Sequence, residues 1–213
     1  MDTINLAPLP DIPVGTPQDI LFIDLQEVLE DISECRYDLP DEVYTGSGPN
    51  VVQKPYEVVI SGDITGLVCN YFDVEYISFD NMTTLNVLSV IENHLADISI
   101  KGKLSNLMMM FAGKNQLMRL NPSYLPRLQV LGCGGMGTMT ELFVGGCPLL
   151  MAVNCFDDSL DEDMLEEIFT DLPDRTGAAT PGLILCGGTN PGYYTADRTI
   201  AHAKNWLTEM PSP

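Results

Sequence analysis

The chain has 213 residues, of which 45% are hydrophobic, and its 30 acidic residues outnumber its 10 basic ones, giving a net charge of −20. This length and apolar content predict one domain with an adequate core plus an arm, and no apolar run reaches the roughly 18 residues that a membrane span needs. The charge excludes nucleic acid and an anionic membrane surface as partners, because both would repel the protein.

Residues 1–56 differ in composition from the rest of the chain and are predicted to form an acidic, proline-rich N-terminal arm. They contain seven prolines, and 11 acidic residues precede position 50, where Arg36 is the only basic residue. Apolar residues recur at helical spacing from Ile20 to Ile32, which predicts one short amphipathic helix in the arm. Residues 56–60 are predicted to form a strand that leads into the domain over residues 57–213.

The segment over residues 64–160 consists of short sequence repeats of nearly constant length. Each unit has an aliphatic residue, an apolar residue three positions later, and a smaller apolar residue five positions later. The three columns of equivalent residues are Ile64, Leu85, Leu107, Leu128 and Leu150; Leu67, Leu88, Met110, Leu131 and Val153; and Cys69, Val90, Ala112, Cys133 and Cys155. A period of roughly 20–29 residues with an LxxLxL core is the signature of a leucine-rich repeat solenoid.

The second and third columns alternate with other residues, as in a strand with one buried face. Such strands bury that face only by stacking side by side, so the units predict an α/β repeat with a curved parallel sheet and few helices. Asn93 and Asn115 follow two of the strands, where they can bond backbone groups of the turn. Met136 and Asp158 replace them in later units, so this ladder is predicted to be imperfect.

The return half of each unit carries a second apolar pair, such as Ile98 and Ile100. The repeat period lies near the short end of the range for leucine-rich units, so little room for a helix is left after a strand and two turns. We therefore expect extended or short 3₁₀ segments on the outer side.

Residues 161–213 are predicted to close the solenoid as a helical C-terminal cap, because the last repeat would otherwise expose its core. Ser159 and several acids precede residues 164–169, a favourable helix start, and the helix should end near Pro173. The elements expected after it are a last strand over residues 182–186, a turn over 190–192 and a final helix over 195–207.

Three segments of this cap, residues 172–177, 190–192 and 196–206, resemble the C-terminal cap of short-repeat bacterial leucine-rich repeat proteins, which are abundant in gut anaerobes. The positions of Cys133 and Cys155 beside the leucine column are similar to the L-x-C-x-x-N-x-L units of that family. The resemblance covers residues 57–213. It implies a non-enzymatic binding or adhesion module, often exported behind a lipoprotein signal.

The N-terminus departs from this family, because it has neither the basic nor the apolar region of a secretion signal. We therefore expect a cytoplasmic or virion-associated protein, unless an export leader has been removed.

Strand residues that point away from the core would form the concave face of the solenoid, and they are largely apolar. The residues expected to contact a partner are Val87, Ile91, Met109, Phe111, Val130 and Phe156. A contiguous exposed apolar patch usually marks a contact surface. Three interpretations stay open: the patch binds a separate protein, the arm covers it with Leu21, Phe22 and Leu25, or the strand assignment is wrong by one residue, which would exchange the faces.

No pattern in the sequence points to catalysis, a cofactor or a metal. His94 and His202 lack a Cys or Ser partner pattern, and no C-x-x-C pair suggests zinc. Residues 132–137 lack the Lys-Ser/Thr ending of a phosphate loop, so their glycines are interpreted as turn residues. The acidic run over residues 157–163 lacks EF-hand spacing and is interpreted as charge at a helix N-terminus.

Three of the six cysteines fall in the buried third column and are expected to be reduced core residues. A bridge between Cys133 and Cys155 is compatible with the spacing of adjacent strands but is not required.

The sequence thus predicts non-enzymatic recognition of a protein partner through the concave face. The alternative is a structural assembly subunit, for example a phage virion component, whose N-terminal arm contacts neighbouring subunits.

Overall fold

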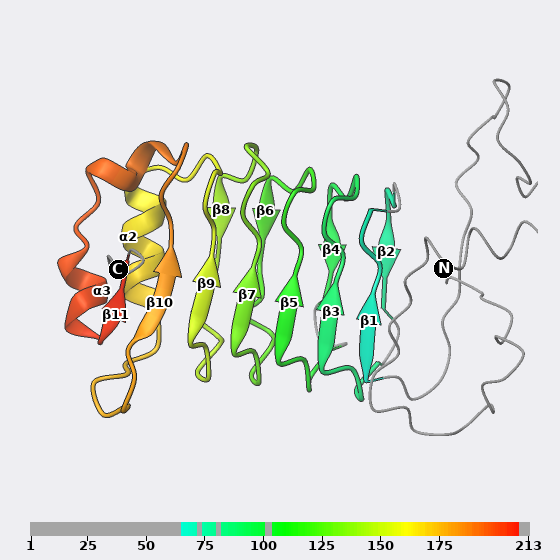
Figure 1. Ribbon diagram of the computed structural model, residues 1–213, viewed down its shortest axis with the longest axis horizontal. Helices are drawn as coiled ribbons and strands as arrows, with labels where there is room; N and C mark the ends of the chain where they lie inside the picture. The colour runs from blue at the N-terminus through cyan, green and yellow to red at the C-terminus, as the bar shows by residue number, and fades with distance from the viewer. Residues whose placement is uncertain (1–64, 72–73, 80–81, 101–103, 209–213) are drawn as a thin grey trace, which may run out of the picture.

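The computed structural model describes residues 65–71, 74–79, 82–100 and 104–208, which form an α/β arrangement with few helices (Figure 1). Seven parallel strands make one sheet in the order β1-β3-β5-β7-β9-β10-β11. Their bounds are Gly66–Val68 (β1), Val87–Ser89 (β3), Met109–Phe111 (β5), Val130–Gly132 (β7), Ala152–Asn154 (β9), Gly182–Leu185 (β10) and Trp206–Leu207 (β11). The predicted α/β class with a parallel sheet is confirmed.

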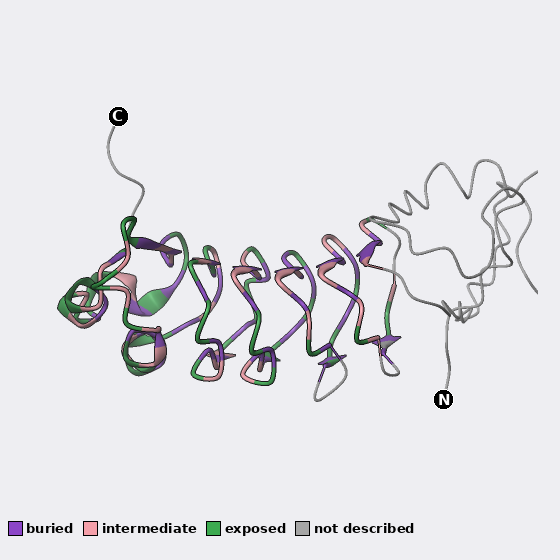
Figure 2. Ribbon diagram, turned by 90° about the horizontal axis from the view of Figure 1, so that it is seen from below, coloured by how far each residue is buried: buried purple, intermediate pink, exposed green. Residues whose placement is uncertain are grey.

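A second layer of short strands lies opposite the seven-stranded sheet (Figure 2). It consists of two separate parallel pairs, β2 with β4 and β6 with β8. The bounds are Ile77–Ser78 (β2), Ile98–Ser99 (β4), Arg119–Leu120 (β6) and Glu141–Leu142 (β8). The return halves of these units are therefore extended, as the short period predicts, and their apolar pairs point into the core. The buried members are Ile77, Phe79, Ile98, Ile100, Leu120, Leu142 and Val144.

Neighbouring strands pair at the register of the sequence repeat. Leu88 lies opposite both Leu67 and Met110, and Leu131 lies opposite both Met110 and Val153. Every described residue of the three apolar columns is buried, while the residues between them on the strands are mostly half-buried or exposed. The interpretation in which the faces are exchanged is therefore wrong.

The turns that follow β1, β3, β5, β7, β9 and β10 all contain a residue with a left-handed backbone at the same position. The residue two positions after the third column has a φ between 52° and 83°. These residues are Tyr71, Glu92, Lys114, Gly135, Asp157 and Gly188. Only two of them are glycine, although a left-handed conformation is unfavourable for other residues. The stacking of the units therefore dictates this turn more strongly than local preference does.

An asparagine ladder runs along these turns and pairs carbonyl groups that the core hides from water. Asn93 donates to the carbonyls of Cys69 at 2.7 Å and Val90 at 3.0 Å. Asn115 donates to those of Val90 at 2.8 Å and Ala112 at 2.9 Å. Each amide thus joins its own unit to the preceding one. The predicted role of these asparagines is confirmed.

The first helix predicted for the cap is confirmed as α2, Glu162–Asp171. Asp161 precedes it and accepts the backbone N–H of Met164 at 2.9 Å, and two acids in the first turn favour the positive end of the helix. The helix buries Leu165, Ile168 and Phe169 in the core next to β8 and ends at Asp171, and its C-cap, Leu172, is the residue before Pro173.

The final helix predicted over residues 195–207 is wrong in extent, and β10 is not the last strand. A 3₁₀ turn, η1, spans Pro191–Tyr194, and α3 covers only Thr199–Ala203. The chain then returns to the sheet as β11, which pairs with β10. The buried Trp206 explains this return, because its indole lies over Gly182 and its Nε1 donates to the carbonyl of Pro173 at 2.8 Å.

The three cap segments named above hold the C-terminal elements together. Lys204 donates to the carbonyls of Thr170 and Leu172 at the negative end of α2. Asn190 continues the asparagine ladder by donating to the carbonyls of Cys155 at 2.7 Å and Cys186 at 3.0 Å. The predicted arm over residues 1–56, its helix, the strand over 56–60 and Ile64 lie outside the described residues.

We expect Leu131→Asp to abolish cooperative folding. Leu131 is 1% exposed and lies between Met110 and Val153 in the sheet, so an aspartate there would be charged without a partner. The cost, at least about 4 kcal/mol, approaches the whole stability of a small domain. Thermal unfolding followed by circular dichroism measures it.

Val130→Asp is the matched control, because it places the same charge one residue earlier on β7, on the opposite face of the sheet. It should keep a cooperative transition at a modestly lower temperature. Equal melting of Leu131→Asp and the native protein would contradict the assignment of the core.

Candidate functional site

The face of the seven-stranded sheet that points away from the core, called the strand face below, is the candidate site. Val87, Met109 and Val130 lie side by side in one row across β3, β5 and β7. All three side chains are half-buried, and Phe111 is half-buried two residues further along β5. The structure therefore brings together four of the six residues predicted to contact a partner.

Glycines shape the strand face around Phe111. A Cβ atom at Gly132 would lie 2.9 Å from Cδ1 of Phe111, so the aromatic ring occupies the space above this glycine on the next strand. A Cβ at Gly113 would lie 2.6 Å from the carbonyl oxygen of Gly134. The backbones approach closely here, which only glycine allows. The result is an aromatic ring packed over a glycine-lined part of the sheet that is half-buried or buried.

Ile91 and Phe156 lie at the ends of their strands rather than in the row of Met109. Ile91 is half-buried, and its backbone N–H donates to the side chain of Asn70 at 2.8 Å. Phe156 is 44% exposed and lies near the turn after β10, where a Cβ at Gly188 would be 2.8 Å from its ring. Phe156 therefore extends the strand face toward the cap, away from the other five residues.

Leu183 and Leu207 belong to the same row but were not predicted. The register places Leu183 opposite Ala152 and Leu207 opposite Leu183, which continues the row of Val130 into β10 and β11. Leu207 is 39% exposed. Its place in the row depends on β11, which the sequence pattern assigned to a helix. Leu183 could have been predicted, because Ile184 and Cys186 repeat the spacing of the second and third apolar columns and Leu183 directly precedes Ile184.

No charged residue lies in the strand segments that carry the strand face. This holds for residues 65–70, 86–91, 108–113, 129–134, 151–156 and 182–187. Glu92, Lys114 and Asp157 stand at the left-handed turns just beyond them, and Lys114 pairs with Glu92. In a chain with a net charge of −20, the charges are thus excluded from one broad surface.

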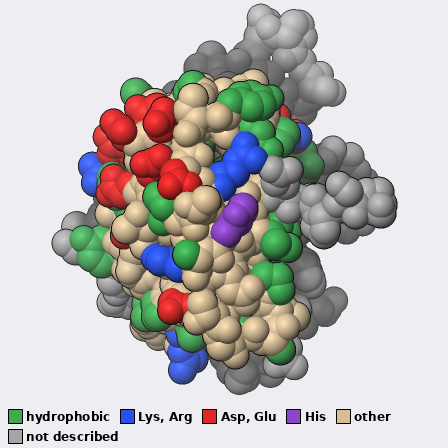
Figure 3. Space-filling view, turned by 90° about the vertical axis from the view of Figure 1, so that its left-hand side faces the viewer, with side chains coloured by type: hydrophobic (Ala, Val, Ile, Leu, Met, Phe, Trp, Pro, Cys, Tyr) green, Lys and Arg blue, Asp and Glu red, His purple; other side chains and the backbone are tan. Residues whose placement is uncertain are grey.

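The acidic residues gather elsewhere, including one part of the C-terminal end of the molecule (Figure 3). Asp161, Glu162, Asp163 and Glu167 of the α2 region are exposed there. Three of them cap or begin the helix, so the interpretation of the acidic run as helix N-terminal charge is confirmed for this part of it. Asp158 is different, because its side chain is buried.

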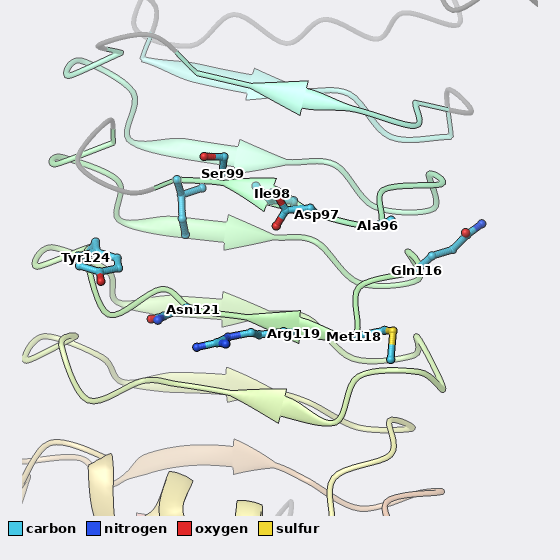
Figure 4. A pocket seen from close by; sticks show the side chains of 10 residues that line it. Ala96, Asp97, Ile98, Ser99, Gln116, Met118, Arg119, Asn121 and Tyr124 are labelled. Atoms are coloured by element: carbon cyan, nitrogen blue, oxygen red, sulfur yellow. The ribbon is translucent and has the colours of Figure 1, made fainter.

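An open depression of about 360 Å³ lies on the opposite side of the molecule, between β4 and β6 (Figure 4). Its lining includes Asp97, Met118, Arg119 and Tyr124. Arg119 is engaged beside it, with its Nε 3.4 Å from Glu141 and its guanidinium 4.8 Å from the ring centroid of Phe143. No histidine or cysteine is among the residues that line the depression.

The five described cysteines are buried free thiols. Burial raises the pKa of Cys69 to about 11 and that of Cys147 to about 12, and it raises the pKa values of Cys133 and Cys155 as well. Such thiols stay protonated and act as small apolar groups. The expectation that Cys69, Cys133 and Cys155 are reduced core residues is confirmed.

Within the part of the chain that the structure describes, no group of three or more His, Cys, Asp or Glu residues is placed to hold a metal ion. His94 and His202 are exposed, and their ring nitrogens lie 3.2 Å from Gln116 and Thr208. Gly135 and Gly137 occupy turns with positive φ, as interpreted from the sequence, whereas Gly132 is a strand residue.

None of the described helices has both the length and the apolar character needed to cross a membrane. Comparison of the chain with known protein families and with curated proteins finds no match.

Proposed function

We propose that the chain is a leucine-rich repeat solenoid that recognises a protein partner, without catalysis, through its strand face. The observation that carries this proposal is the absence of charge from that face in a strongly acidic chain. The buried centres of protein interfaces are depleted in charged residues and enriched in aromatic residues and methionine. Met109 and Phe111, at the middle of the strand face, fit this composition.

The repeat supports the solenoid interpretation. Its successive units place equivalent residues opposite one another in the sheet, and the asparagine ladder links the same backbone groups in neighbouring units. Solenoids use the exposed face of such a sheet as an extended binding surface. The likeness to short-repeat bacterial leucine-rich repeat proteins supports the same role.

The chemistry of the strand face favours a protein over other partners. A nucleic acid would need basic residues at the contact, and the face has none. The apolar and aromatic side chains of this face, which lie beside glycines, instead fit an apolar protein surface.

We expect Met109→Glu to leave folding intact and to weaken partner binding by at least about tenfold, because it places an unpaired charge at the centre of a dry contact. Met118→Glu is the matched control, since Met118 is 65% exposed on the opposite side of the molecule. The measurement retains proteins from an extract of the source cells on the immobilised native protein and on both variants.

Partners held by the native protein and by Met118→Glu should be lost from Met109→Glu, while all three proteins melt at similar temperatures. Retention of the same proteins by Met109→Glu would contradict recognition through the strand face. A collapse of its melting temperature alone would show that Met109 is a core residue.

A second candidate function, a structural assembly subunit, is favoured by the composition of residues 1–56, with their seven prolines and excess of acids. Under this alternative, the arm ties neighbouring subunits together. We expect the recognition proposal to hold, with both the full chain and a variant lacking residues 1–56 running as monomers in size-exclusion chromatography with light scattering. Concentration-dependent oligomers of the full chain alone would instead establish the assembly role.

A further inference from the structure

Asp158 occupies a position of the asparagine ladder. It lies three residues after Cys155 in the third column, as Asn93 follows Val90 and Asn115 follows Ala112. In the next unit, Asn190 makes the same bonds from one position later. At this position of the ladder, a side chain must supply one acceptor for a backbone N–H and one donor for buried carbonyl groups.

Asp158 performs the first function but, as a carboxylate, lacks the second. Its Oδ1 accepts the backbone N–H of Met136 at 3.0 Å, as Oδ1 of Asn115 accepts that of Leu95 at 3.1 Å. Because its Oδ1 matches the Oδ1 of the asparagines, its Oδ2 corresponds to their donating Nδ2. Among the described residues this oxygen has no hydrogen-bond partner, although Asp158 is only 1% exposed.

The backbone of the preceding unit contains a carbonyl group that lacks the corresponding donor. The third-column carbonyls of Cys69, Val90, Ala112, Cys155 and Cys186 each accept a bond from a ladder asparagine. In the described part of the chain, the carbonyl of Cys133 is the one of this column that accepts no bond from a ladder asparagine. The side chain of Met136, which takes the asparagine position in that unit, has no donor for this carbonyl. By the ladder pattern, the carbonyl of Cys133 is the group that the side chain of Asp158 should bond.

The ladder pattern thus places two acceptors opposite each other without a donor, which is unfavourable in a buried place because each loses its water partners. One proton on Oδ2 gives both oxygens a hydrogen bond, because the protonated Oδ2 can donate to the carbonyl oxygen. We propose that Asp158 is a neutral carboxylic acid in the folded protein, donates this proton to the carbonyl of Cys133, and so makes the turn after β9 a pH-sensitive switch.

The surroundings of Asp158 support this state. Burial, opposed by the backbone N–H groups of Met136 and Gly137, raises its pKa from 3.8 to about 7, and the neighbouring Asp157 adds to the rise. The other titratable groups that face it are the thiols of Cys133, on the preceding unit, and Cys155, at the end of β9. Asp161 at the start of α2 is exposed and bonded to Met164.

The switch has a definite direction. The pKa of Asp158 in the folded protein, about 7, lies above the ordinary value of 3.8, so the folded state binds this proton more tightly than the unfolded state. The contribution of Asp158 to stability is therefore complete below about pH 4 and is lost as the pH rises through about 7. Most paired carboxylates act in the opposite direction.

Ionisation of Asp158 acts on the end of the strand face nearest the cap. Asp157 accepts the backbone N–H of Thr189 at 3.0 Å, and the carbonyl of Asp158 accepts the hydroxyl of Thr189 at 3.1 Å. These bonds join the turn after β9, which carries Phe156, to the turn after β10. A charge on Asp158 loosens this junction, and the inference stands whether or not the strand face binds a protein.

Asp158→Asn tests the proposal, because it supplies a donor at every pH. Chemical unfolding of the native protein and the variant between pH 4 and 8 gives an unfolding equilibrium constant for each. The ratio of the native constant to that of the variant should rise about tenfold per pH unit between about pH 4 and 7 and then level off. Other acids contribute equally to both proteins and cancel in the ratio.

Asp157→Asn is the matched control, since it removes the neighbouring charge and keeps both an acceptor for Thr189 and a residue that tolerates positive φ. It should keep the rise of the unfolding constant with pH that the native protein shows, with the upper end of the rise at a slightly lower pH, because the charge of Asp157 is a minor cause of the raised pKa of Asp158. A ratio for Asp158→Asn that stays constant from pH 4 to 8 would overturn the proposal.

A second measurement does not depend on the variant. The carboxyl carbon of Asp158 in the ¹³C NMR spectrum of the native protein should titrate near pH 7, and the backbone N–H of Met136 should lose protection above that pH, measured relative to its intrinsic base-catalysed exchange rate. Titration of this carboxyl near pH 4 would equally overturn the proposal.

Discussion

The structure depends on one constraint, the pairing of buried carbonyl groups where each strand leaves the large sheet. Side chains of the core keep water from these groups, so the turn itself must supply the donors. Asn93, Asn115 and Asn190 do so, and each bonds carbonyls of two successive units. A polar network that joins neighbours in this way sets their register, whereas the apolar columns alone would tolerate small shifts. The left-handed backbone of Glu92 and Lys114, directly before Asn93 and Asn115, is the conformational cost of this arrangement.

The same regular stacking determines where large and small residues alternate on the strand face. Residues on equivalent positions of neighbouring strands stand about 4.8 Å apart, so an aromatic ring can lie flat over the next strand only where that strand carries a glycine. Phe111 next to Gly132 follows this rule, and so does Phe156 near Gly187 and Gly188. An aromatic ring over a glycine covers backbone that would otherwise be exposed, and it limits the ring's freedom to move. The outward row is thus organised before any partner arrives, which lowers the entropy cost of binding.

The repeat made the buried columns, the parallel sheet and the extended return segments predictable, because one short period recurs with little variation from unit to unit. The helix after Asp161 was predictable for a local reason, its acidic start. The end of the chain was not. Residues 195–207 have helical composition, but burying the indole of Trp206 over Gly182 outweighs that preference and restores a strand. The partner of Asp158 was equally hidden, since its unpaired oxygen is a property of packing between units.

The distribution of charge separates the ways in which the strand face can be used. A net charge of −20 opposes the approach of a second copy of the chain, whereas the strand face, which carries no charge, adds no electrostatic repulsion of its own. Contact between two copies would therefore strengthen as salt screens their mutual repulsion over distances of about 10 Å or less. A complex with a basic protein, steered by the acids around the face and cap, would weaken in the same salt. A contact confined to the apolar row would respond little. The dependence of association on ionic strength thus reports whether the face alone, or the acidic surface around it, selects the partner.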